Sequence, residues 1–93
     1  MELSELQQTI ADTYGARDAA RGVPATVAWL AEELGELAQA VRKGTAEEQL
    51  HELGDVLAWL ASLAVQLDLS LDDAVQRYAA GCPRCGAVPC TCS

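Results

Sequence analysis

The feature that most constrains this chain is a pair of long amphipathic segments that meet at Gly44. Apolar residues recur at helical spacing over residues 24–42 and again over residues 46–68. Gly44 favours the end of the first helix, and Thr45 with Glu48 forms a capping box for the second. A connection this short joins antiparallel neighbours, so the sequence predicts a helical hairpin. We expect its core to be formed by an apolar stripe that consists of Val27, Leu30, Ala31, Leu34, Leu37, Ala38 and Val41 on the first helix and Leu50, Leu53, Leu57, Leu60 and Ala64 on the second.

A shorter helix is predicted on each side of the hairpin. Ser4 is expected to cap a first helix over residues 5–19. Ser70 is expected to begin a fourth helix that runs to about residue 80, and Gly81 closes it. Ala and Leu dominate the chain and β-branched residues are few, so the composition also favours an all-α fold.

Length and charge narrow the class of protein. Ninety-three residues form one small domain, here residues 1–80, followed by a cysteine-rich tail over residues 81–93. The net charge of −8 argues against binding to nucleic acid or anionic lipid, because phosphate contacts need clustered Lys and Arg. The N-terminus lacks the pattern of a signal peptide, and no uncharged apolar run reaches the roughly 18 residues of a membrane span. We therefore expect a cytoplasmic protein without a nucleic-acid or membrane partner.

Carboxylates follow a second stripe on each hairpin helix, beside the apolar one. Glu33 and Glu36 lie on the first helix, and Glu52 and Asp55 lie on the second. A tight turn at Gly44 would set Glu36 level with Glu52 and Glu33 level with Asp55. The sequence therefore predicts that two carboxylate pairs meet across the hairpin.

Four carboxylates in one patch repel one another. Two unit charges ~4 Å apart cost on the order of 1 to 4 kcal/mol, depending on screening. Oxygen ligands on facing helices suit hard cations such as Mg²⁺ or Mn²⁺, which remove this repulsion. A solvated helix face is the alternative for either pair alone, but neither stripe carries Lys or Arg to pair with the acids. We name the predicted metal ligands the acidic cluster: Glu33, Glu36, Glu52 and Asp55.

These acids also carry a resemblance to a known family. The segments "EELGE" (Glu32–Glu36) and "ELGD" (Glu52–Asp55) resemble the E-E-x-x-E…E-x-x-D signature of MazG-like nucleotide pyrophosphohydrolases, which belong to the all-α NTP pyrophosphohydrolase superfamily. The resemblance covers about residues 4–80. It implies a four-helix MazG-like bundle that is completed by dimerisation, or by a higher homo-oligomer.

The resemblance further implies an enzyme activity. A nucleoside triphosphate would be hydrolysed to the monophosphate and pyrophosphate, with Mg²⁺ as the cofactor and water attacking the α-phosphorus. The acidic cluster would hold the metal, and Glu32 would position or activate the water. Clearing surplus or noncanonical nucleotides is the expected role. Two alternatives stay open: a related superfamily enzyme acting on dUTP, dCTP or a phosphoribosyl nucleotide, and a non-enzymatic, zinc-stabilised helical module whose acidic patch binds a basic partner.

Further side chains are weaker candidates for nucleotide binding. Trp59, one turn after Asp55, and Trp29 opposite it are expected to stack on a base, or else to pack between helices or subunits. Another group of side chains would contact phosphate or base, but such residues are more often surface or interface residues: Arg17, Arg21, Lys43, Arg77 and Tyr78. His51 is predicted to point away from the acids and to take no part in catalysis.

The tail "CPRCGAVPCTC" has the pattern C-x2-C-x4-C-x-C, formed by Cys82, Cys85, Cys90 and Cys92. Its first half resembles the zinc knuckle of zinc ribbons. Four thiolates can close a tetrahedral Zn²⁺ site without an open position, so a structural zinc ion is predicted. Redox thiols or an iron–sulfur cluster are the alternatives for the same cysteines.

Overall fold

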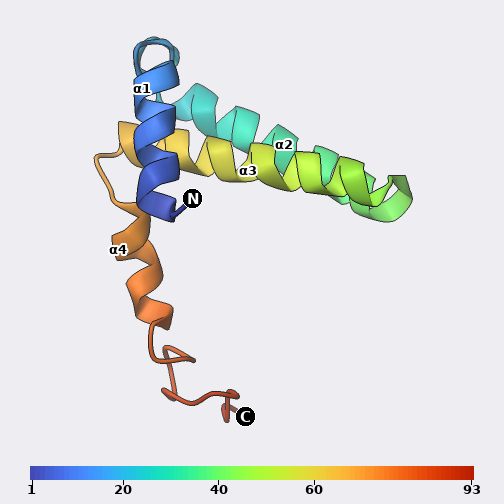
Figure 1. Ribbon diagram of the computed structural model, residues 1–93, viewed down its shortest axis with the longest axis vertical. Coiled ribbons are helices and arrows are strands. Elements are labelled where there is room, and N and C mark those ends of the chain that lie inside the picture. The colour runs from blue at the N-terminus through green and yellow to red at the C-terminus, as the bar shows by residue number, and fades with distance from the viewer.

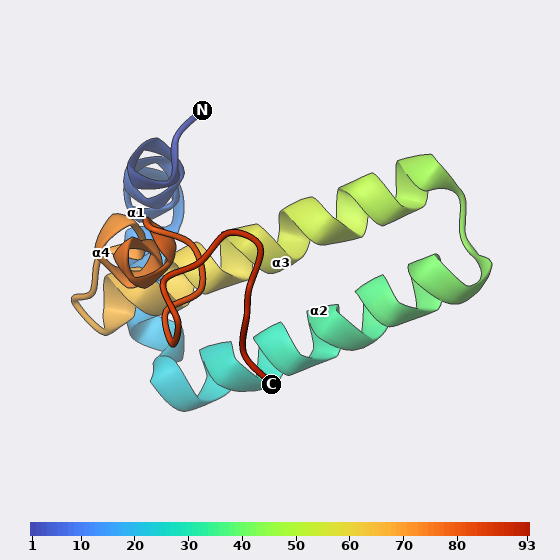
Figure 2. The ribbon, with the colours of Figure 1, turned by 90° about the horizontal axis from the view of Figure 1, so that it is seen from below.

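The computed structural model describes residues 1–93 and contains four α-helices, one 3-10 helix and no strand. In chain order the elements are α1 (Leu3–Arg21), α2 (Val23–Lys43), α3 (Ala46–Gln66), α4 (Leu71–Val75) and the 3-10 helix η1 (Gln76–Tyr78). Figure 1 shows α2 and α3 side by side as a long hairpin, with α1 lying across the end where α3 finishes. Figure 2 shows the same hairpin from below, with α1 and α4 at one of its ends. The predicted all-α fold is confirmed.

The turn of the hairpin forms as the sequence predicts. The Thr45 hydroxyl accepts a hydrogen bond of 3.1 Å from the backbone N–H of Glu48. The Glu48 carboxylate in turn accepts one of 3.3 Å from the backbone N–H of Thr45. Gly44 ends α2, and its N–H donates to the Ala40 carbonyl at 2.8 Å. A Cβ atom at Gly44 would lie 2.8 Å from that same oxygen, so the chain turns through a space that only glycine fits. These contacts bring α2 and α3 together antiparallel.

The helix boundaries lie within about two residues of the prediction except at the end of the fourth helix, and the start of α1 differs in its cap. Ser4 lies inside α1 rather than at its cap, because Glu2, two residues earlier, is the N-cap, and its backbone N–H donates to the Glu5 carboxylate at 3.1 Å. Ser70 does begin α4, since its hydroxyl accepts from the Asp73 N–H at 3.2 Å. The fourth helix is shorter than predicted, however, because it tightens into η1 after five residues.

The buried core is small; most of it lies where α1 crosses the hairpin, and Ala40 lies near the turn at the other end. Eight residues are buried, and the apolar ones are Ile10, Ala40, Val56, Ala61 and Ala64. The prediction that the apolar stripe forms the core of the chain is wrong. Of the stripe only Ala64 is buried, and seven large members are exposed: Val27, Leu34, Val41, Leu50, Leu53, Leu57 and Leu60.

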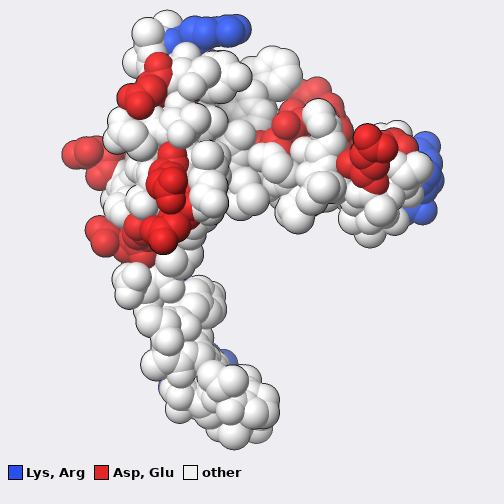
Figure 3. Space-filling view, viewed as in Figure 1, with Lys and Arg blue, Asp and Glu red and all other residues white.

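The physical reason is that α2 and α3 meet through the neighbouring stripe. Ala40 and Val56 are buried between the helices, so the carboxylate side of the hairpin faces inward and the apolar side faces outward. Figure 3 shows uncharged atoms over much of the visible side of the hairpin. No single helix is both long and apolar enough to cross a membrane, although α3 with the α4–η1 segment, bent by 110°, meets that criterion as a pair by length and composition.

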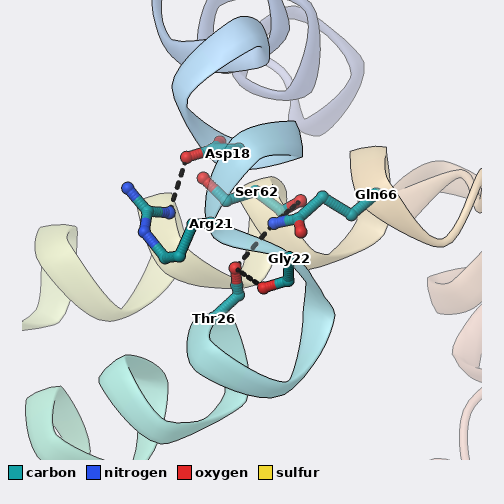
Figure 4. A network of polar contacts seen from close by, with 6 residues as sticks. All are labelled: Asp18, Arg21, Gly22, Thr26, Ser62 and Gln66. Atoms are coloured by element: carbon teal, nitrogen blue, oxygen red, sulfur yellow. Dashed lines mark hydrogen bonds and ion pairs between the residues drawn. The ribbon is translucent and has the colours of Figure 1, made fainter.

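A buried polar network joins the end of α1 to the hairpin. Thr26 is fully buried, and its hydroxyl donates to the Gly22 carbonyl at 3.0 Å while accepting from Nε2 of Gln66 at 2.7 Å. Figure 4 shows these contacts beside the Asp18–Arg21 ion pair and Ser62. The network fixes the start of α2 against the end of α3.

We expect Thr26→Val to lower the free energy of unfolding by about 1–3 kcal/mol, because valine leaves the Gln66 amide without its nearest acceptor. Chemical unfolding followed by circular dichroism measures the change. Thr13→Val, at an exposed position of α1, is the matched control and is expected to have little effect. Equal stability of the two variants would contradict the role of the network.

Candidate functional site

The hairpin brings the predicted carboxylates together. One oxygen each from Glu33 and Glu36 on α2 and from Glu52 on α3 lie within 4.8 Å of one another. Asp55 lies one turn further along α3, and one of its oxygens is within 4.8 Å of a Glu52 oxygen. The predicted approach of Glu36 to Glu52 therefore agrees with the observed geometry, and Asp55 is near enough for its charge to raise the pKa of Glu33.

The acidic cluster has no Lys or Arg side chain to neutralise it. Neither Lys nor Arg forms an ion pair with any of its members. Burial raises the pKa of Glu33, and the charges of Glu36, Asp55 and Glu52 raise it further. Buried oxygens of Glu33 and Glu52 (Oε2 in each) have no hydrogen-bond partner. Such orphaned acceptors are costly unless a cation or donor reaches them.

His51 lies closer to the acids than predicted. Its Nε2 is 3.3 Å from Oδ2 of Asp55, one turn later on the same face of α3. The prediction that His51 points away from the acidic stripe is therefore wrong. Its side chain is mostly exposed, so it reaches Asp55 from the solvent side of the cluster.

The two tryptophans pair across the hairpin. The rings of Trp29 and Trp59 are stacked, with centroids 6.1 Å apart and planes 12° from parallel. The guanidinium of Arg21 lies 4.7 Å from the centroid of the Trp59 ring. Arg21 also forms a 2.7 Å ion pair with the buried carboxylate of Asp18. Asp18 thus fixes Arg21 against the aromatic pair.

Asp18 was not predicted to be a site residue. Its spacing of three residues from Arg21 at the end of α1 was the available signal, but nothing in the sequence placed that turn against α3. In the structure Asp18 is 2% exposed and its Oδ2 has no hydrogen-bond partner.

A cleft of about 280 Å³ opens beside the acidic cluster, between α1 and α3. Arg17, Arg21 and Trp59 line it, so three of the predicted nucleotide-binding residues meet at one place. Asp55 lies on its wall and connects it to the acidic cluster. We call this hollow the Trp59 cleft; its full lining is Ile10, Tyr14, Arg17, Asp18, Arg21, Asp55, Ala58, Trp59 and Ser62.

Other candidates lie elsewhere. Lys43 lines a separate hollow near the hairpin turn, with Glu36 and Glu52 on its wall. Arg77 and Tyr78 are exposed on η1, where the guanidinium lies 5.2 Å from the ring centroid, and neither lines the Trp59 cleft. Glu32 is exposed on α2 and is not among the clustered carboxylates.

A second group of potential metal ligands lies in the tail. The four cysteine sulfurs lie within 4.8 Å of one another and form no disulfide. Hydrogen bonds from Thr91, with a smaller contribution from the Ala87 backbone, lower the pKa of the Cys85 thiol to about 5. This group is separate from the acidic cluster, because the tail extends beyond α4 and away from the hairpin (Figure 1).

Comparison with known families gives one match. The model of the MazG nucleotide pyrophosphohydrolase domain matches residues 21–83, which is more than half of the chain. The matched region contains the whole acidic cluster and both tryptophans. No curated protein matches the chain at a significant level.

Proposed function

Because this chain belongs to the MazG nucleotide pyrophosphohydrolase family, we propose that it hydrolyses a nucleoside triphosphate to the monophosphate and pyrophosphate with the help of Mg²⁺ or Mn²⁺. The observation that supports this most is the convergence of the acidic cluster from two helices without a Lys or Arg partner. Clearing surplus or noncanonical nucleotides is the role that fits this reaction.

The donor set suits a hard divalent cation. All four side chains offer carboxylate oxygens, and two of these oxygens are buried without a partner. Glu33, Glu36, Glu52 and Asp55 are therefore the proposed metal ligands. A divalent ion bound there would supply an activated water and would neutralise charge on the phosphates.

The chain's own side chains are proposed to position the nucleotide. Trp59 is proposed to contact the base from the wall of the cleft, and Arg17 and Arg21 offer guanidinium groups for phosphate oxygens within the same cleft. Asp18 holds Arg21 in place through the 2.7 Å ion pair. Glu32, which is exposed beside Glu33, is proposed to position the attacking water. Attack on the α-phosphorus then releases pyrophosphate as the leaving group.

We also propose that a second copy of the chain covers the apolar stripe. Its seven large exposed residues are 38% to 73% accessible, and a hydrophobic surface of this kind is rare on a stable monomer. Two hairpins that pack through these stripes form a four-helix bundle. A single chain of this size buries too little apolar surface to be robust by itself.

The activity is tested by measuring pyrophosphate release over a panel of NTPs, dNTPs and a phosphoribosyl nucleotide, with and without Mg²⁺. We expect Mg²⁺-dependent pyrophosphate from at least one member. A preference for dUTP, dCTP or a phosphoribosyl nucleotide would assign the chain to the related superfamily enzymes. No release from a broad panel would instead favour the non-enzymatic interaction module.

Glu33→Gln tests the electrostatics of the acidic cluster. Without Mg²⁺ or Mn²⁺ at pH 7–8, we expect the variant to melt a few degrees above the wild type, because the amide removes a partly buried charge that Glu36 and Asp55 repel. Folding raises the pKa of Glu33, so the wild type gains stability as the pH falls toward the ordinary value of 4.5. The difference in Tm should therefore shrink at acidic pH.

Adding Mg²⁺ should reverse the order of the two melting temperatures. The wild type gains stability by binding the ion, whereas the variant has lost a proposed ligand. Glu47→Gln, an exposed change on α3 outside the acidic cluster, serves as the matched control. An equal gain of Tm with Mg²⁺ in Glu33→Gln and in the wild type would exclude Glu33 as a ligand.

A further inference from the structure

We infer that the C-terminal tail is a structural zinc site in which Cys82, Cys85, Cys90 and Cys92 hold one ion as four thiolates. Three of these cysteines lie beyond residues 21–83, so the family match does not account for them. The inference is independent of the proposed hydrolysis, because it concerns a different group of residues in a different part of the fold.

The spacing of the sulfurs fits a single tetrahedral ion. All four Sγ atoms lie within 4.8 Å of one another, and those of Cys82 and Cys92 are 3.7 Å apart. A tetrahedron with Zn–S distances of ~2.3 Å has sulfur–sulfur edges of ~3.8 Å. Residues separated by ten positions in the chain have thus been brought to the distance that a shared ion requires.

The backbone around the first two cysteines forms a tight loop. The Gly86 N–H donates to the Cys82 carbonyl at 2.7 Å, and the Cys82 N–H donates to the Ala87 carbonyl at 3.1 Å. Gly86 has a φ of +72°, which favours glycine at this position. Gly81 has a φ of +110°, and a Cβ there would overlap the Val88 side chain. Both glycines are needed for the chain to fold back on Cys82.

Backbone donors also point at the sulfurs. The Thr91 N–H lies 3.4 Å from Sγ of Cys85, and the Cys92 N–H lies 3.3 Å from Sγ of Cys90. Hydrogen bonds of this kind orient and stabilise ligand atoms around a metal. The tail has no helix or strand, and three of its four cysteines are exposed. A bound ion is therefore the interaction best able to hold these residues in one arrangement.

The identity of the ion follows from the number and spacing of the ligands. Four soft thiolates favour zinc or an iron–sulfur cluster. A cluster distributes its cysteines over several iron atoms, whereas these four sulfurs are close enough to share one ion. Zinc also binds such ligands more tightly than ferrous iron does. Because all four positions are filled by protein ligands, the ion has no open position, and its role is structural.

Elemental analysis of the purified full-length protein tests the inference without any assay of hydrolysis. We expect about one zinc per chain. Replacing zinc by Co²⁺ should give the visible absorption of a tetrahedral tetrathiolate site. Cys85→Ser and Cys90→Ser should each lose most of the zinc, whereas the control Arg84→Ala, within the same loop, should keep it. The helix content measured by circular dichroism should stay unchanged in all variants, because the tail contributes no helix.

Three results would overturn the zinc site. The purified protein could contain no metal and have four titratable thiols, or it could contain iron in place of zinc. The third result is that Cys85→Ser and Cys90→Ser both keep all of their zinc. None of them bears on pyrophosphate release, and an inactive protein that contains one zinc per chain would refute only the proposed hydrolysis.

Discussion

Glu36→Gln and Asp55→Asn are each expected to lower kcat/KM for the preferred nucleotide by more than about 100-fold. Loss of a group that merely orients a metal ligand costs 10- to 100-fold in affinity or activity, so loss of a ligand itself should cost at least as much. The two side chains come from different helices and approach the same cluster. The amides keep the shape of the side chains but remove the charge that a divalent cation needs.

The comparison requires folded variants and a matched control. Circular dichroism and the melting temperature establish that the helices persist in each variant. Glu47→Gln, on an exposed position of α3, removes one negative charge outside the acidic cluster and should retain activity within a few-fold. If Glu36→Gln and Asp55→Asn both kept the activity of this control, the acidic cluster would not be the metal site.

The second large effect is expected on the oligomer. Leu53 and Leu57 lie on the apolar stripe of α3 and are 48% and 40% exposed in the single chain. Burying a leucine side chain contributes about 1.5–3 kcal/mol, and each substitution acts twice in a symmetric dimer. We expect the double variant Leu53→Asp, Leu57→Asp to lose the dimer and the cooperative thermal transition.

Light scattering coupled to gel filtration measures this directly. The wild type should have at least twice the 9.8 kDa mass of one chain, and the double variant should have the mass of one. Leu69→Asp is the matched control, because this leucine is 60% exposed in the connection between α3 and α4 and lies off the stripe. A monomeric wild type that melts cooperatively would exclude the proposed bundle.

The arrangement of the acids could be predicted because it depends on local chemistry. The capping box of Thr45 and Glu48 and the glycine at residue 44 set the turn, and the turn sets the register of two regular helices. A regular antiparallel hairpin then requires residues at the same height to meet. The stacking of Trp29 on Trp59 follows from the same register.

Features that depend on the packing of several elements could not be predicted. The apolar stripe was expected inside the chain, because periodicity shows that a face is apolar without showing which molecule covers it. The position of α1 decides where Asp18 and Arg21 lie, and no local pattern places α1 against α3. The prediction for His51 was wrong for a different reason: Asp55 lies four residues later on α3, so the two side chains share one face of the helix, and this spacing was present in the sequence.

The central claim is that water attacks the α-phosphorus of a nucleoside triphosphate. Its most direct test is to run the reaction in water enriched in ¹⁸O and to find which product receives the water oxygen. We predict that, with Mg²⁺ present, the label enters the nucleoside monophosphate and not the pyrophosphate, since water attacks the α-phosphorus. Mass spectrometry of the two products measures this. Release of orthophosphate with a nucleoside diphosphate, or label found in pyrophosphate, would contradict the proposed reaction.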